Sequence, residues 1–178
     1  MLRLFAALAV PEDVADVLGT RQHDLPGARW RPAEALHITL RFFGEIPENQ
    51  ADDLDAELGR VSGRPLQLEL EGVGAFGEGR DLHAVWAGVA ENAELRQLAS
   101  RCEAAARRAG LAPDRRVYRP HVTLAYLSRP DPPDVAAWIQ RNNLLKSPPF
   151  GVASFGLYSS RKGESGPAYR LEQSYPLV

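Results

Sequence analysis

One short pattern occurs twice in the chain, and it restricts the fold more than any other feature. Residues 37–40 read His-Ile-Thr-Leu, and residues 121–124, which begin 84 positions later, read His-Val-Thr-Leu. Both copies lie in stretches rich in β-branched and aromatic residues, which predicts strands. Because side chains alternate between the two faces of a strand, each histidine shares a face with its threonine, and the apolar residues point the other way. The fold must therefore hold two strands that each present a polar face and bury an apolar one.

Predicted strands and helices alternate along the rest of the chain. Strands are expected at 2–10, 36–43, 66–75, 81–90, 120–127, 149–160 and 167–175, and helices at 11–23, 48–60, 92–109 and 134–145. The strand at 36–43 is expected to stop at Gly44, and the segment 161–166 is expected to be a mobile loop. This pattern predicts an α+β fold with two similar lobes, in halves of roughly 1–90 and 91–178. No linker separates the halves, so residues 1–178 are expected to form a single domain.

Composition limits the class of protein. The 178 residues are 44% hydrophobic and 25% charged, which is typical of folded domains and not of disordered or fibrous chains. A single cysteine, Cys102, excludes an internal disulfide and predicts a reducing compartment, the cytoplasm. The apolar start of the chain is too short for a membrane span and is interpreted as a buried strand rather than a signal peptide. We expect a monomer that does not associate with membranes.

The charge is unevenly distributed. Residues 1–100 contain 17 acidic and 9 basic side chains, whereas residues 101–178 contain 6 acidic and 12 basic ones. Arginines make up 19 of the 21 basic residues, and the planar guanidinium suits phosphate. The basic second half therefore either meets an anionic ligand or reflects genome composition, with its charges solvated. A pI of about 6.1 and the lack of a basic run argue against a protein that coats duplex nucleic acid.

The two histidines suggest acid–base chemistry. An imidazole has an ordinary pKa near 6.5, so one of a pair can be neutral and the other protonated near neutral pH. The neutral ring can accept a proton from water, and the protonated ring can donate one to a leaving oxygen. The threonine hydroxyls can donate hydrogen bonds to phosphate oxygens. Neither motif has a nearby second histidine, cysteine or suitable acid, so a metal site is the weaker interpretation.

The sequence resembles the 2H phosphoesterase family, and within it the RNA 2′,3′-cyclic phosphodiesterases of bacteria and archaea, formerly called 2′-5′ RNA ligases. The resemblance covers the whole chain in order. It is carried by both histidine motifs, which extend over 37–44 and 119–125, by the opening stretch 2–8, and by 155–161, 166–169 and 175–177. It implies two pseudo-symmetric lobes of antiparallel sheet and helices around a central cleft, with no cofactor and no metal. The implied substrate is an RNA end with a 2′,3′-cyclic phosphate, which is opened to a 2′-phosphomonoester.

The resemblance also implies residue roles. His37 corresponds to the proton donor to the leaving 3′ oxygen, His121 to the base that activates water, and Thr39 and Thr123 to groups that hold the phosphate. Members of this family often have arginine where this chain has Tyr126. The missing guanidinium is then absent or is supplied by Arg119, Arg129 or Arg41, and strand alternation favours Arg41 because it should share the face of His37.

Phe42 and Tyr126 each lie five residues after a motif histidine. Either ring could stack on a base at the rim of the cleft or pack between the lobes. The other histidines, His23 and His83, lack the threonine and are interpreted as structural. Cys102, Trp30, Trp86 and Trp138 are interpreted as packing residues.

Three functions remain in competition. The first is metal-independent hydrolysis of the cyclic phosphate, and the second is reversible 2′-5′ ligation, which also needs a bound 5′-hydroxyl RNA. The third is a non-catalytic RNA- or nucleotide-binding module, which would not need paired acid–base groups.

Overall fold

The computed structural model describes residues 1–164 and 166–178. Within them, the chain forms ten strands, four α-helices and two short 3-10 helices. In chain order the elements are β1 (Leu2–Ala9), α1 (Glu12–Gly19), β2 (Ala28–Trp30), η1 (Ala33–Ala35), β3 (His37–Ile46), α2 (Glu48–Leu58), β4 (Leu66–Leu68), β5 (Leu70–Phe76), η2 (Gly79–Asp81), β6 (Ala84–Val89), α3 (Ala93–Arg108), β7 (His121–Leu127), α4 (Pro132–Asn142), β8 (Phe150–Val152), β9 (Ser154–Gly163) and β10 (Gly166–Pro176).

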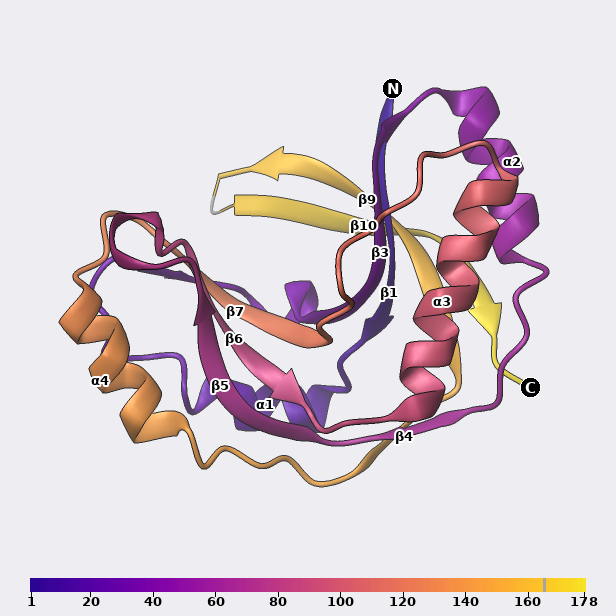
Figure 1. Ribbon diagram of the computed structural model, residues 1–178. Coiled ribbons are helices and arrows are strands. Elements are labelled where there is room, and N and C mark those ends of the chain that lie inside the picture. Colours follow the sequence, from indigo (N-terminus) through magenta and orange to yellow (C-terminus); the bar gives the residue numbers. More distant parts are fainter. Residues whose placement is uncertain (165) are drawn as a thin grey trace.

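An eight-stranded sheet organises the molecule, and all of its ladders are antiparallel. Its order is β10-β9-β1-β3-β7-β6-β5, and β2 pairs with β7 outside this path. Figure 1 shows β1, β3, β9 and β10 with helices α2 and α3 on one side, and β5, β6 and β7 with α4 on the other. The predicted α+β class with antiparallel sheet is confirmed.

The sequence predicted that the two lobes divide the chain near residue 90, and this division is wrong. The late strands β9 and β10 join the early strands β1 and β3, while the early strands β2, β5 and β6 join the late strand β7. Each half of the sequence therefore supplies strands to both sides. Hydrogen bonding between distant segments, which strand patterns do not encode, decides this arrangement.

The two sides meet where the two motifs meet. β3 and β7 are neighbours, and their ladder consists of the pair Ile38 and Val122, both fully buried. Each of these residues lies between the histidine and the threonine of its own motif. In an antiparallel pair, this register brings His37 opposite Thr123 and Thr39 opposite His121.

Both motif strands contain a β-bulge at the same place. In β3, Ala7 pairs with Thr39 but Ala6 pairs with Arg41, so Leu40 is an extra residue. In β7, Trp86 pairs with Thr123 but Val85 pairs with Ala125, so Leu124 is an extra residue. An extra residue reverses the alternation of every side chain that follows. The residues that directly follow each bulge, Arg41 and Phe42 in β3 and Ala125 to Leu127 in β7, therefore lie on the face opposite to the one that simple alternation predicts.

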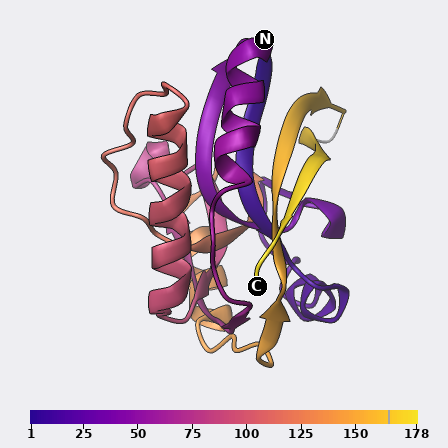
Figure 2. The same ribbon diagram turned by 90° about the vertical axis from the view of Figure 1, so that its right-hand side faces the viewer.

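Helices cover the face of the sheet opposite the motif histidines. Asn92 caps helix α3: its side chain accepts a hydrogen bond from the backbone N–H of Leu95 (2.9 Å). The helix buries an apolar stripe that includes Cys102. α3 packs against β3, and α2 lies beside α3, as Figure 2 shows from the side. Among residues 1–164 and 166–178, no α-helix packs on the other face of β1, β3 and β9 (Figure 1).

Several predicted boundaries differ from the structure. Helix α1 ends at Gly19, four residues earlier than expected, and β3 continues past Gly44 to Ile46. Gly44 has a φ of +79° beside a second extra residue, Phe43, so it bends the strand without ending it. The loop expected at 161–166 is mostly strand, since β9 reaches Gly163 and β10 starts at Gly166; residue 165 lies outside the described residues. No helix in the described part of the chain is both long and apolar enough to span a membrane.

Candidate active site

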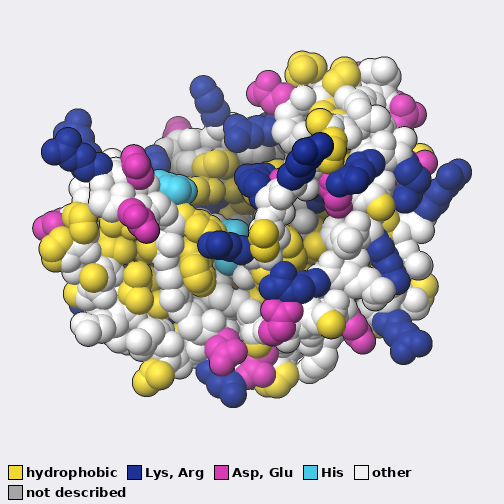
Figure 3. Space-filling model, viewed as in Figure 1, with side chains coloured by type: hydrophobic (Ala, Val, Ile, Leu, Met, Phe, Trp, Pro, Cys, Tyr) yellow, Lys and Arg dark blue, Asp and Glu magenta, His cyan; other side chains and the backbone are white. Residues whose placement is uncertain are grey.

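The two motifs form one constellation on the helix-free face. His37, Thr39, His121 and Thr123 are all half-buried, while the apolar residues between them are fully buried. In this register, His37 and His121 are diagonal neighbours across the strand pair, a relation for which Cα spacings of roughly 7–8 Å are typical. Figure 3 shows the surface hollowed between the two sides of the molecule, with a histidine ring visible in the hollow.

Aromatic rings surround the imidazole of His37. Ring centroids of Tyr158, Tyr169 and Phe5 lie 4.6, 5.5 and 6.1 Å from it, each in an edge-on arrangement. Burial lowers the pKa of His37; the carbonyl of Ala35 opposes this shift and the positive charge of Arg31 adds to it. The ring nitrogen Nδ1 is buried and makes no hydrogen bond of good geometry with any described residue. The remaining nitrogen, Nε2, is the one left for chemistry.

A second aromatic group surrounds His121. Phe76 lies 4.8 Å and Trp86 6.3 Å from its ring. The Nδ1 atom is 2.6 Å from the carbonyl oxygen of Arg119, so it carries the proton and Nε2 can accept one in the neutral ring. Burial lowers the pKa of His121, while the hydrogen bond to this carbonyl raises it. Both imidazoles therefore favour the neutral form in the free protein.

Phe42 and Tyr126 both lie on the histidine face. The bulges explain this, because five residues after each histidine would otherwise be the opposite face. Phe42 pairs with Phe5, is 53% exposed, and has its ring 5.5 Å from that of Phe5. Phe42 also lines a groove of about 500 Å³ together with Arg41, Arg116 and residues 110–114. Base stacking by either ring remains a prediction.

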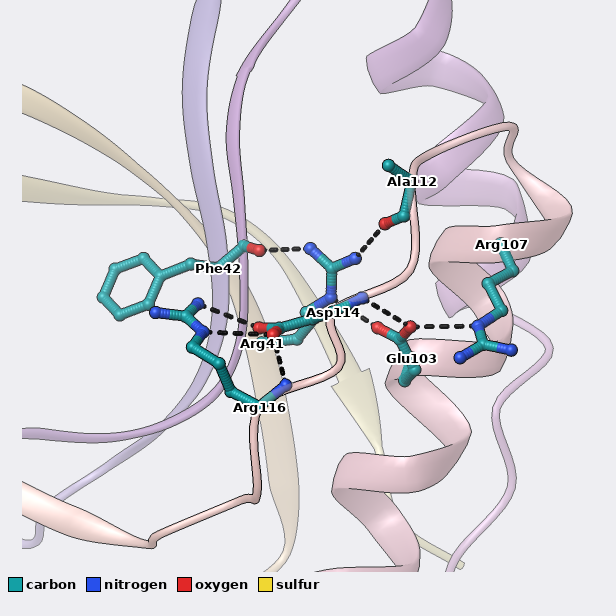
Figure 4. Close-up of polar contacts among 7 residues, drawn as sticks. All are labelled: Arg41, Phe42, Glu103, Arg107, Ala112, Asp114 and Arg116. Atoms are coloured by element: carbon teal, nitrogen blue, oxygen red, sulfur yellow. Dashed lines mark hydrogen bonds and ion pairs between the residues drawn. The ribbon is translucent and has the colours of Figure 1, made fainter.

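Arg41 does not lie on the histidine face, so its predicted placement beside His37 is wrong, and its role as a phosphate ligand loses that support. The bulge at Leu40 reverses the alternation, and Arg41 points to helix α3 on the opposite face. Figure 4 shows its guanidinium bonded to Glu103 (2.6 Å) and to the carbonyl oxygens of Ala112 (2.7 Å) and Phe42. With a side chain only 9% exposed, Arg41 fastens α3 and the segment after it to β3.

The other candidate arginines are exposed. Arg119 precedes the second motif and contributes its backbone carbonyl to His121, while Arg129 follows β7 in a left-handed conformation with a φ of +48°. Whether either guanidinium binds phosphate remains a prediction. The sequence interpretation missed Arg31, which is 4% exposed and lies over the rings of Tyr126 and Tyr169. It lies outside every recognisable motif, so its only sequence signal was its place six residues before His37.

Most residues predicted to be structural lie away from the constellation. Cys102 is fully buried, and burial raises the pKa of its thiol to about 12, so it is not a nucleophile. His23 is exposed beside Asp24, and Trp138 is fully buried with Trp30 at 6.0 Å. Trp86 differs, because it packs beside His121. Among the described residues, no three histidine, cysteine or acidic side chains are grouped as metal ligands.

Comparisons with known proteins agree with this arrangement. A family model described as the 2′-5′ RNA ligase superfamily matches residues 10–164. An RNA 2′,3′-cyclic phosphodiesterase of Archaeoglobus fulgidus is 30% identical, and the alignment covers 95% of this chain and 97% of that protein.

Two solved structures show the same fold. A protein of Thermus thermophilus superposes with a TM-score of 0.82 at 25% identity, and Escherichia coli LigT in complex with 3′-AMP superposes with a TM-score of 0.78 at 26% identity. Each comparison covers 99% of this chain and 98% of the other.

Proposed function

This chain belongs to the 2′-5′ RNA ligase superfamily, and from that premise we propose that it is a metal-independent RNA 2′,3′-cyclic phosphodiesterase. The product is a 2′-phosphomonoester with a free 3′-hydroxyl. The observation that carries the proposal is the adjacency of β3 and β7, which brings two histidines and two threonines to one face. Relatives named RNA 2′,3′-cyclic phosphodiesterase, at 25–31% identity, support the substrate class.

In the proposed reaction, His121 accepts a proton from water through Nε2 as the water oxygen forms a bond to phosphorus. The bond between phosphorus and the 3′ oxygen breaks, and protonated His37 donates its proton to that oxygen. The two rings end with their protonation exchanged, and solvent restores them. The strand register is symmetric, so the assignment of acid and base follows the family.

The threonines and the phosphate complete the mechanism. Thr39 and Thr123 donate hydrogen bonds to the non-bridging oxygens, where negative charge develops during attack. Burial lowers the pKa of both histidines, so the acid must become protonated when the substrate binds. The negative phosphate favours this, because an opposite charge nearby raises the pKa of an imidazole. Two imidazoles then supply both proton transfers without a metal-bound water.

The test is turnover of a short RNA with a 2′,3′-cyclic phosphate end in the presence of EDTA. We expect a 2′-phosphate product, and a loss of at least ~10² in turnover for both His37→Ala and His121→Ala. His23→Ala is the matched control, since this histidine is exposed and its ring pairs with Asp24. A 3′-phosphate product would contradict the role of the 3′ oxygen as leaving group. Activity that EDTA abolishes and a divalent ion restores would contradict the metal-independent mechanism.

A further inference from the structure

Arg31 is a buried cation on the face of the sheet that carries the histidines. It directly follows β2, and its backbone N–H donates to the carbonyl oxygen of Leu124 (2.8 Å). Because Arg29 pairs with Tyr126 in the β2–β7 ladder, residues 29 and 31 have the same orientation as Tyr126. The side chain of Arg31 therefore lies beside the candidate active site, on the edge that β2 adds to β7.

No carboxylate neutralises this guanidinium among the residues that the structure describes. One amino group donates to the carbonyl oxygen of Pro167 (2.6 Å). A Cβ atom at Gly166 would lie 2.6 Å from the other terminal nitrogen of Arg31, so only a glycine allows the backbone to approach the guanidinium this closely. A buried charge that has no counterion is unfavourable, and a bound anion would stabilise it.

Two tyrosines contact this charge, and one of them, Tyr169, also reaches the first motif. The guanidinium carbon of Arg31 is 5.4 Å from the ring centroids of both Tyr126 and Tyr169, within range for a cation–π contact. The ring of Tyr169 is in turn 5.5 Å from that of His37. Burial, together with the charge of Tyr126 and a hydrogen bond to it, raises the pKa of Tyr169 to about 12, although Arg31 acts to lower it, so the phenol stays protonated at neutral pH.

We propose that Arg31, Tyr126 and Tyr169 form an anion-binding wall beside His37 that takes a non-bridging oxygen of the substrate phosphate. In the Tyr126–Tyr169 pair one phenol donates to the other, so the remaining O–H donates to the anion, and Arg31 behind the pair supplies the positive charge. The assignment of the anion as the RNA phosphate rests on the proposed function. The wall itself is a phosphate site whether or not the bound group is turned over.

The experiment compares the full-length protein with Arg31→Gln, Arg31→Lys, Tyr126→Phe and Tyr169→Phe. Arg60→Gln is the matched control, since it removes an arginine charge from a side chain that is 77% exposed and pairs with Glu57. KM and kcat are measured with the cyclic-phosphate RNA, and inorganic phosphate is titrated as a competitive inhibitor. We expect Arg31→Gln to weaken phosphate binding and raise KM, each about 10-fold, with partial rescue by Arg31→Lys. Each tyrosine variant should weaken phosphate binding by a few fold.

A second measurement separates this role from a purely structural one. The charge of Arg31 lowers the pKa of His37, so the His37 ring followed by NMR should titrate at higher pH in Arg31→Gln, while His121 is unchanged. If Arg31→Gln does not fold, the tyrosine variants, which keep the ring packing, decide the question. Unchanged phosphate affinity and KM in the variants that fold would overturn the proposal. A wild-type protein that binds phosphate through this wall but does not hydrolyse the RNA would refute the proposed function and leave the anion site in place.

Discussion

Removal of Arg41 should destabilise the protein and leave its chemistry almost intact. Arg41 is 9% exposed at its side chain and donates to Glu103, Ala112 and Phe42. Glu103 also accepts from Arg107 (3.0 Å) and from the backbone N–H of Asp114 (2.9 Å). Although burial alone would raise it, these hydrogen bonds hold the pKa of Glu103 below its usual value.

The magnitude follows from this geometry. Breaking a buried ion pair by removing one partner costs about 3–5 kcal/mol, and the lower end applies because Glu103 is 20% exposed and keeps two donors. We therefore expect Arg41→Met to lower the free energy of unfolding by about 3 kcal/mol, which corresponds to a Tm lower by roughly 6–12 °C for a chain of this size. Arg107→Gln is the control: it bonds to the same carboxylate, but its side chain is 57% exposed, so about 0.5 kcal/mol or less is expected.

Urea unfolding of Arg41→Met, Glu103→Gln and the double variant gives the coupling energy, which should be about 1–3 kcal/mol. At a temperature where every variant is folded, KM for the cyclic-phosphate RNA should stay within about 3-fold of the wild type, since the guanidinium points away from the histidines. A KM raised 10-fold or more by Arg41→Met but not by Glu103→Gln would refute this reasoning. It would restore Arg41 as a phosphate ligand.

Three further outcomes are expected. Burial lowers the pKa of His37 and His121, so the neutral rings persist to lower pH in the free protein. The bell-shaped pH profile of kcat/KM, which reports the free protein, should therefore be centred below the usual imidazole value of 6.5, and the profile of kcat, which reports the complex with phosphate bound, should lie at higher pH. A kcat/KM profile centred above pH 7 would contradict these shifts. Tyr118→Phe removes the hydroxyl that donates to the carbonyl oxygen of Thr39 (2.8 Å) and should destabilise the protein by about 1 kcal/mol, as measured by urea unfolding; an unchanged midpoint would show that this bond is dispensable. Gly74→Ala places a Cβ atom 2.4 Å from the indole of Trp86, which packs beside His121. We expect this variant to lose about 1–3 kcal/mol in stability and to have a lower kcat. Unimpaired turnover would mean that Trp86 does not position the histidine.

Local pattern was sufficient to predict the placement of the two motifs in strands. His37 with Thr39, and His121 with Thr123, share a face because only one apolar residue separates the members of each pair. Alternation failed for Arg41, since a bulge depends on how two strands pair and not on the residues of one strand. The same bulges bring Phe42 and Tyr126 to the histidine face, where their spacing alone would not put them.

Long-range pairing accounts for the rest. Arg31 reaches the site because three residues of β2 pair with β7, which is distant in sequence, and no property of Arg31 itself indicates this. Likewise, the helix and strand patterns of residues 1–90 resemble a self-contained lobe. The two sides of the sheet seen in the structure form only when β9 pairs with β1 and β10 pairs with β9.

This exchange of strands has a consequence for the synthesis of the chain on the ribosome. β1 is buried on both faces over Leu4–Leu8, and one of its two neighbours is β9, which is among the last segments to be translated. Pairings between segments so far apart form slowly, and the apolar strand remains a site for aggregation until they do. His37 likewise has its aromatic neighbours Tyr158 and Tyr169 on the two C-terminal strands. A nascent chain that carries both motifs but has not yet released residues 154–176 therefore lacks a complete candidate active site.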